Sequence, residues 1–74
     1  MKPSTQKILD HLIEHGSLTP LAALNKFGEF RLAARIHELR GYRWPIETQR
    51  VKMESKGSSY ANYILDQDQD MWPQ

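Results

Sequence analysis

Two histidines have the spacing of a metal-binding pair. His11 and His15 are four residues apart with Glu14 between them, and on a helix this spacing places both imidazoles on one face. A structural zinc site needs four ligands and usually includes thiolates, whereas the chain has no cysteine. The sequence therefore predicts two surface histidines, no metal site and no cofactor.

The other side chains show no catalytic arrangement. No nucleophile is combined with a base and an orienting acid, and the glycines do not form a phosphate-binding loop. A chain of 74 residues also has little room for an enclosed substrate pocket. We therefore expect no catalytic residues and no enzyme activity.

Basic side chains offer a different chemistry, which is contact with a polyanion. At 100° per residue, a helix over 29–40 places four apolar residues on one face, where we expect them to point to the core: Leu32, Ala33, Ile36 and Leu39. The opposite face holds the candidates for base readout in a DNA groove: Phe30, Arg31, Ala34, Arg35 and Glu38. The small Ala34 permits close approach of the helix to the groove, and Arg31 or Arg35 can contact guanine or phosphate.

A second set of side chains is suited to phosphate contacts. Four of them belong to or border a small polar loop, and two belong to a preceding helix: Arg50, Lys52, Lys56, Ser58, Thr19 and Lys26. Two other interpretations stay open. Glu38 can pair with Arg31 and Arg35 on a solvated helix face, and the lysines can prevent edge-to-edge pairing of strands.

Helical elements must position these groups. Ser4 or Thr5 can cap a first helix with one apolar stripe, and Gly16 ends it: Ile8, Leu9, Leu12 and Ile13. Residues 17–19 are long enough only for a bridging strand. Thr19-Pro20 begins a second helix that Gly28 breaks, and a third helix over 29–40 is closed by Gly41.

The composition after residue 43 predicts a β-hairpin. Residues 44–53 are an extended segment, 54–59 a polar loop and 60–65 a second strand with Tyr63 and Leu65 on one face. The DQDQD segment at 66–70 is expected to be solvated and mobile, as part of a flexible acidic tail over 66–74. Trp72 either folds back on the domain or binds a partner.

The segment TPLAALNKFGEFRLAARIHELRGYRWPI resembles the small winged helix-turn-helix domains that are common in phages and prophages. The similarity rests on the TP-x-x-AL start, the FG turn, the FRLAARIHELR helix and the PI entry to the hairpin, and it extends over roughly residues 5–65. It implies an α+β fold with three helices, a short bridging strand and a C-terminal β-hairpin wing. It also implies DNA binding in the regulation of a phage or mobile element. One departure is Arg43-Trp44 before Pro45, which is bulkier than the small or basic residues expected there.

Charge divides the chain into a basic domain, 1–65, and an acidic tail, 66–74. Ten Lys and Arg against six Asp and Glu leave the domain at +4, and three aspartates leave the tail at −3. The whole chain carries +1 with a mean hydropathy of −0.68. A domain of this size is expected to use nearly every apolar residue in folding. It has no long apolar run or secretory signal, so we expect a cytoplasmic protein without membrane contact.

Two functions are compatible with this sequence. The first is a sequence-preferring, double-stranded DNA-binding protein that acts as a transcriptional regulator or an excisionase-like accessory factor, with helix 29–40 in the major groove and the wing at 50–60 on the backbone. It would bind as a homodimer or cooperatively at tandem sites, since one small module buries little surface. The alternative is a winged-helix protein-interaction module, such as a phage-encoded inhibitor of a host complex, that does not bind DNA and meets its protein partner through the tail 66–74.

Overall fold

The computed structural model describes residues 1–53, 57 and 59–73. In chain order these residues form α1 (Pro3–His15), β1 (Ser17–Leu18), α2 (Pro20–Phe27), α3 (Leu32–Gly41), β2 (Ile46–Lys52), β3 (Ser59–Leu65) and a short 3-10 helix, η1 (Gln69–Met71). The predicted α+β layout of three helices, a bridging strand and a hairpin is confirmed. No helix in the described ranges is long and apolar enough to cross a membrane.

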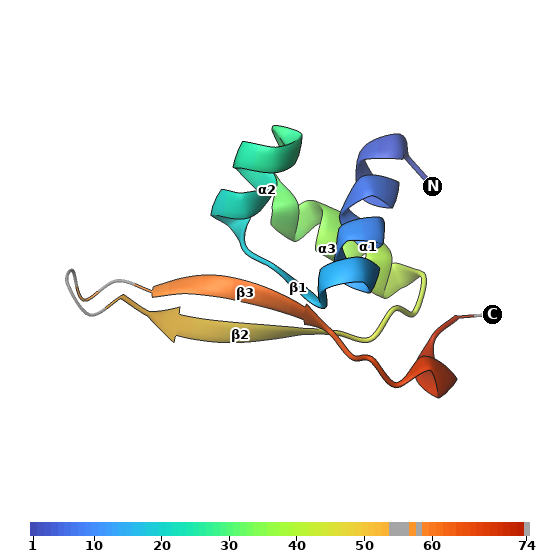
Figure 1. The fold of residues 1–74 in the computed structure, drawn as a ribbon. Helices are drawn as coiled ribbons and strands as arrows, with labels where there is room; N and C mark the ends of the chain where they lie inside the picture. Colours follow the sequence, from blue (N-terminus) through green and yellow to red (C-terminus); the bar gives the residue numbers. More distant parts are fainter. Residues whose placement is uncertain (54–56, 58, 74) are drawn as a thin grey trace.

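The helices lie on one side of a small antiparallel sheet (Figure 1). The strand order is β1-β3-β2, and the hairpin register runs from Ile46 opposite Leu65 to Lys52 opposite Ser59. The hairpin extends past the helices at one end, and both termini lie at the other end (Figure 1). The domain is accordingly elongated, with extents of 42 × 25 × 20 Å.

The core forms where the three helices meet the sheet. Its largest fully buried apolar side chains come from α1, α3 and β3: Ile8, Leu12, Ile36, Leu39 and Leu65. The expectation that folding uses nearly every apolar residue is wrong. Among the described residues, several large apolar side chains are exposed, with Phe30 at 85% and Leu21 at 67% exposure.

Local signals set most helix ends. Gly16 has φ 85° and its N–H donates to the Leu12 carbonyl, and Gly28 has φ 64°. Both φ values lie in the left-handed region that favours glycine. Thr19 caps α2, since its hydroxyl oxygen accepts from the Ala22 N–H at 3.2 Å. These three predictions are confirmed.

The predicted cap of α1 is wrong. Lys2 is the N-cap residue and Pro3 takes the first helical position, where its fixed φ and missing N–H are suited to a helix start. Thr5 therefore lies inside the helix. It is fully buried, and its hydroxyl donates to Glu38 of α3 at 2.6 Å.

Helix α3 differs from the prediction in its ends and its rotation. It begins at Leu32 because residues 29–31 form a turn, in which the Arg31 N–H donates to the Glu29 carboxylate at 2.9 Å. It continues through Gly41, and the positive φ of 74° falls on Arg43. Ala33 is exposed, not buried. The covered side of α3 is rotated from the predicted one toward Arg35 and Glu38, because α1 packs on the flank of α3 that carries Glu38.

The tail folds back on the domain. The Trp72 indole N–H donates to the Asp66 carbonyl at 2.7 Å, and the Trp72 ring lies 5.4 Å from the Trp44 ring between centroids. Of the two predicted alternatives for Trp72, the structure has the one in which Trp72 folds back on the domain. The bulky Trp44 before Pro45 is explained by the same contact.

Candidate nucleic-acid interface

One face of α3 is exposed along its length. The buried side of the helix carries Leu32, Ile36 and Leu39. The exposed side begins in the turn before the helix and continues to its last turn: Phe30, Ala33, His37 and Arg40. Ala33, His37 and Arg40 are spaced four and three residues apart, which is the spacing of a single helical stripe, and Phe30 precedes this stripe in the turn. This stripe is presented to solvent by the tight connection between α2 and α3 that Gly28 begins.

Arg40 joins this stripe to the hairpin. Its Nε and Nη2 donate to the Ile46 carbonyl at 3.0 and 2.9 Å, and Nη2 also donates to Thr48 Oγ1 at 2.8 Å. Hydrogen bonds from a charged donor are stronger than neutral ones. The last turn of α3 is therefore held against the first half of β2.

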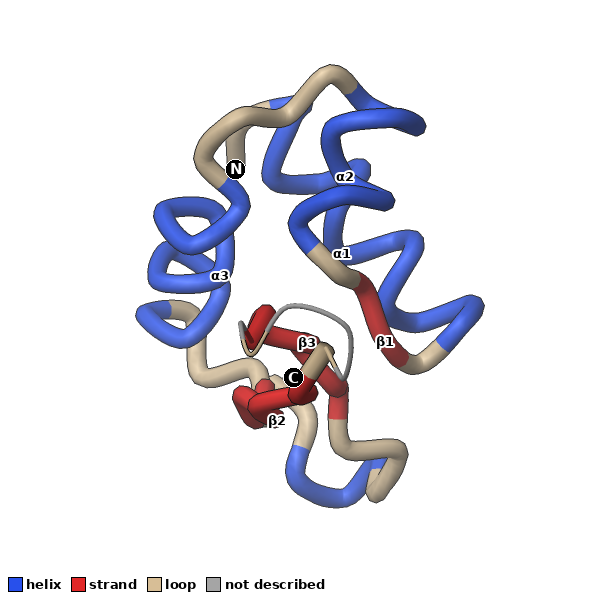
Figure 2. Tube along the Cα trace, turned by 90° about the vertical axis from the view of Figure 1, so that its left-hand side faces the viewer, coloured by secondary structure: helices blue, strands red, loops and turns tan. Residues whose placement is uncertain are grey.

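Basic side chains continue along β2. Alternate residues of a strand point to the same face, so Thr48, Arg50 and Lys52 leave β2 on the face that Ile46 directs toward the helices. Arg50 and Lys52 are exposed. Figure 2 shows α3 and β2 on the same side of the molecule, with α2 and β1 on the other. Arg40, Arg50 and Lys52 thus form a basic row that runs from α3 into the hairpin.

The opposite flank of α3 faces α1. Glu38 accepts from Thr5 and lies 3.2 Å from Arg35 Nη2 and 3.8 Å from Lys2 Nζ. The Thr5 hydrogen bond, followed by the charges of Arg35, Lys2 and His37, lowers the pKa of Glu38 against the opposing effect of burial. Glu38 thus connects α3 to α1.

The predicted readout residues therefore divide into two groups. Phe30 and Arg31 are exposed at the start of α3. Ala34, Arg35 and Glu38 are partly buried on the α1 flank, and the Arg35 side chain is only 17% exposed. The structure does not bring these five residues together on one open face. Sequence reasoning missed Ala33, His37 and Arg40, which their helical spacing of four and three residues could have indicated.

The predicted phosphate contacts are also separated. Arg50 and Lys52 lie in the basic row, whereas Lys56 and Ser58 lie outside the described residues. The Thr19 hydroxyl is used as the α2 cap. Lys26 lines a shallow hollow between α1 and α2, together with residues such as Asp10 and His11.

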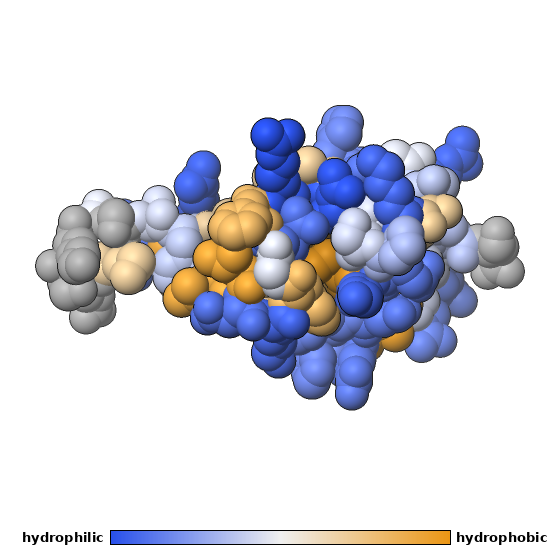
Figure 3. Space-filling model, turned by 90° about the horizontal axis from the view of Figure 1, so that it is seen from above, coloured by the Kyte–Doolittle hydropathy of each residue, from blue (hydrophilic) through white to orange (hydrophobic). Residues whose placement is uncertain are grey.

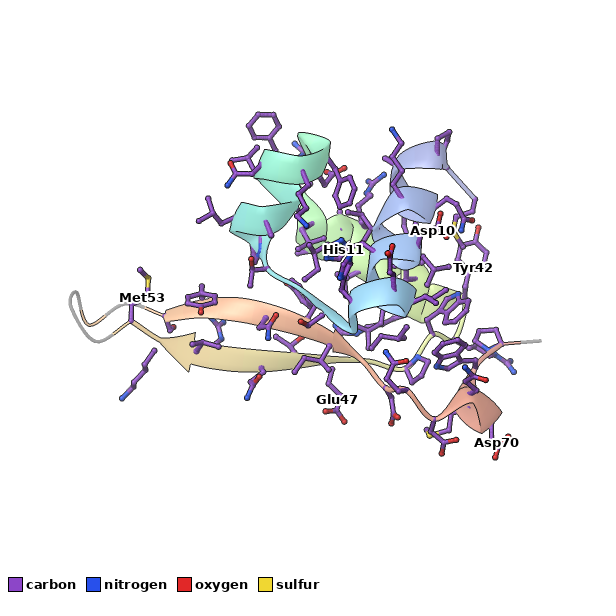
Figure 4. All side chains as sticks on the ribbon, viewed as in Figure 1. Asp10, His11, Tyr42, Glu47, Met53 and Asp70 are labelled. Atoms are coloured by element: carbon purple, nitrogen blue, oxygen red, sulfur yellow. The ribbon has the colours of Figure 1, made fainter. Side chains whose placement is uncertain are left out.

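His11 also lines this hollow, whereas His15, one turn further along α1, is exposed. The His11 ring lies 4.5 Å from the His15 ring and 5.7 Å from the Phe27 ring, between centroids, and Figure 4 shows His11 between α1 and α2. Burial, followed by the charges of His15 and Lys26, lowers the pKa of His11. Across residues 1–53, 57 and 59–73, no group of three or more His, Asp or Glu side chains could hold a metal ion. His11 packs against Phe27 between α1 and α2, whereas the His15 side chain is exposed.

Comparison with known proteins gives one match. The model of a family described as a winged helix-turn-helix domain matches residues 4–68. No curated protein and no solved structure matches the chain. The matched range includes α1 to β3, and therefore the whole exposed stripe of α3 and the basic row.

Proposed function

The chain belongs to the winged helix-turn-helix domain family, whose general role is DNA binding, and from that premise we propose that it binds double-stranded DNA with sequence preference. The exposed stripe of α3 enters the major groove, and the basic row holds the phosphate backbone beside it. The observation that carries this proposal is the continuity of the two surfaces, since Arg40 fastens the end of the stripe to the start of β2.

Each part of this surface has a distinct role. Ala33 is small enough to let the helix backbone approach the base edges, while His37 and Arg31 supply hydrogen-bonding groups on either side of it. Arg50 and Lys52 neutralise phosphates, and their contacts position the domain without reading sequence. Arg40 is a positioning residue, because its donors are already directed to Ile46 and Thr48.

The finer assignment rests on the phage and prophage resemblance. We propose a cytoplasmic regulator of transcription or an excisionase-like accessory factor, which acts by occupying or bending its site. Occupying or bending a DNA site needs no catalytic group.

DNA selection tests the proposal. Duplexes enriched from a random pool by the full chain should share a motif, and affinity for it should be measured by fluorescence anisotropy. His37→Ala and Arg31→Ala should each reduce the preference for this motif over random duplex by about 1–3 kcal/mol. Lys7→Ala removes an exposed charge from α1 and serves as the control, with its preference unchanged.

Two results would contradict the proposal. A wild-type chain that binds no duplex at low salt would favour the protein-interaction module. Binding with a preference that neither His37→Ala nor Arg31→Ala changes would place readout on another surface.

A further inference from the structure

The tail packs on the connection between α3 and β2. Its η1 turn and Trp72 lie outside residues 4–68, which are the part of the chain that the family model describes. The connection also departs from the family resemblance, because Trp44 stands where a small or basic residue is expected. Trp44 and Trp72 are the two tryptophans of the chain, and their rings lie 5.4 Å apart between centroids. The two departures from the family pattern are therefore partners in one contact.

The tail is fastened near both of its ends. At its start, the Asp66 N–H donates to the Pro45 carbonyl at 2.9 Å. Near its other end, the Trp72 indole N–H donates to the Asp66 carbonyl at 2.7 Å, and the half-buried Trp72 packs against the core. Between them, the Asp68 carboxylate accepts from the Asp70 N–H at 3.1 Å and caps η1. The described part of the tail is a folded turn.

The surface around this turn is mainly polar. At the end of the molecule opposite the hairpin, the face seen from above shows mostly hydrophilic residues, and apolar side chains gather nearer the base of the hairpin (Figure 3). The apolar ring of Trp72 is used inside the molecule, on Trp44.

The connection beneath the tail sets the start of β2. The Trp44 N–H donates to the Leu39 carbonyl at 3.1 Å, and the Trp44 carbonyl accepts from the Ile46 N–H at 3.0 Å. Arg43 has a positive φ of 74°, which residues other than glycine keep only where surrounding contacts hold it. The next residue, Trp44, carries the ring contact to Trp72. The tail therefore packs on the segment that directs β2 away from α3.

This segment leads directly to the hydrogen bonds of Arg40. The Ile46 carbonyl, which accepts from Arg40 at 3.0 and 2.9 Å, is two residues after Trp44. Arg50 and Lys52 follow on the same strand. A displacement of Trp44 would therefore change the position of the basic row relative to the exposed stripe of α3.

We propose that Trp72 is a positioning residue for DNA binding, which by packing on Trp44 holds the basic row at the spacing from α3 that lets both surfaces contact one duplex. The inference rests on the proposed DNA-binding function and adds a role for the tail within it. The tail acts through packing, because its three aspartates carry the same charge sign as the phosphates.

Two variants separate packing from charge. Trp72→Ala removes the ring and keeps all three aspartates, whereas Asp68→Asn/Asp70→Asn removes two charges and keeps Trp72. Asparagine still provides the acceptor that caps η1. At about 0.1 M salt, one lost phosphate contact lowers affinity about tenfold and the salt slope by about 0.9. In fluorescence anisotropy on the selected motif, Trp72→Ala should show this loss, and the aspartate variant should bind at least as tightly as the wild type.

Two further variants control for a general loss of stability. Trp72→Phe keeps a ring against Trp44 and should restore most of the affinity. Phe27→Leu removes a ring contact with His11 between α1 and α2, and it should keep the affinity and the salt slope of the wild type. All variants are compared at a temperature at which circular dichroism shows them to be folded.

NMR of the free chain gives a readout that needs no DNA. The Arg40 Nε–H donates to the Ile46 carbonyl, and the Ile46 N–H donates to the Trp44 carbonyl, so both protons report on the connection. In Trp72→Ala, both resonances should shift and the Arg40 Nε–H should exchange faster with solvent. In Phe27→Leu, they should stay at the wild-type positions. Unchanged resonances in Trp72→Ala overturn the inference whether or not the chain binds DNA.

The binding results distinguish this inference from the proposed function. A wild type that binds no duplex contradicts the proposed function and the inference together. If the wild type binds and Trp72→Ala has the same affinity and salt slope, the function stands and the inference is overturned. Tighter binding by Trp72→Ala, or an equal loss in the aspartate variant, also overturns the inference, because the tail would then act through its charge.

Discussion

Removing the two exposed charges of β2 should change the salt dependence of DNA binding in a calculable way. Each phosphate contact contributes about 0.9 to the slope of log affinity against log salt. The double variant Arg50→Ala/Lys52→Ala lacks two such contacts, and both side chains are exposed on β2, so its slope should be smaller by about 1.8. Between about 50 and 200 mM salt, the wild type should lose about tenfold more affinity than the variant.

Fluorescence anisotropy over a salt series, on the selected motif and on random duplex, measures both slopes. The loss of affinity should be similar for the two DNAs, because phosphate contacts carry no sequence information. The matched control is Lys7→Ala/Lys26→Ala, which removes the same charge from the α1–α2 hollow and should leave the slope unchanged. Equal slope changes in both double variants would refute a localised phosphate contact at β2 and indicate a general effect of net charge.

Three further predictions concern stability. Because the folded-state pKa of Glu38 is lowered, its contribution to folding stability is complete above the ordinary value of 4.5 and is lost as pH falls through the lowered pKa. Glu38→Gln should therefore flatten the decrease of the melting temperature with falling pH between about pH 6 and 3. A decrease that is the same as in the wild type would contradict the Thr5–Glu38 contact. Trp72→Ala removes the Trp44 contact and the Asp66 hydrogen bond, so the free energy of unfolding in urea should fall by about 1–3 kcal/mol. An unchanged free energy of unfolding would mean that the tail is not packed in solution. Gly28→Ala should cost about 1–2 kcal/mol, since φ is +64° with open space around it. Gly41 is the last residue of α3 and has equal space around it, so Gly41→Ala should stabilise by about 0.5 kcal/mol. Calorimetry that shows the same sign for both variants would refute the assignment of the helix ends.

Prediction from sequence succeeded where the signal is local. Gly16, Gly28 and the Thr19-Pro20 pair determine helix ends through their own backbone preferences, and the structure has them as predicted. Apolar alternation also identified the buried face of β3, with Tyr63 and Leu65. Such features need no knowledge of distant residues.

The failures come from contacts between distant segments. The rotation of α3 depends on the hydrogen bond from Thr5 to Glu38, which joins residues 33 positions apart, and on the packing of Arg35 beside it. A helical wheel drawn for 29–40 cannot show which flank α1 covers, so Ala34, Arg35 and Glu38 were placed on the open face. Arg40 was missed for the same reason, because its partners Ile46 and Thr48 belong to the hairpin.

The three hydrogen bonds of Arg40 hold the last turn of α3 against the first half of β2. The spacing between α3 and β2 is therefore not freely adjustable. If both elements contact the duplex as proposed, any mismatch between this spacing and the DNA is met by a change in groove width or curvature, and the cost of that change depends on the flexibility of the base steps. The preferred site should therefore contain flexible steps, such as TA or CA, at positions that no side chain contacts.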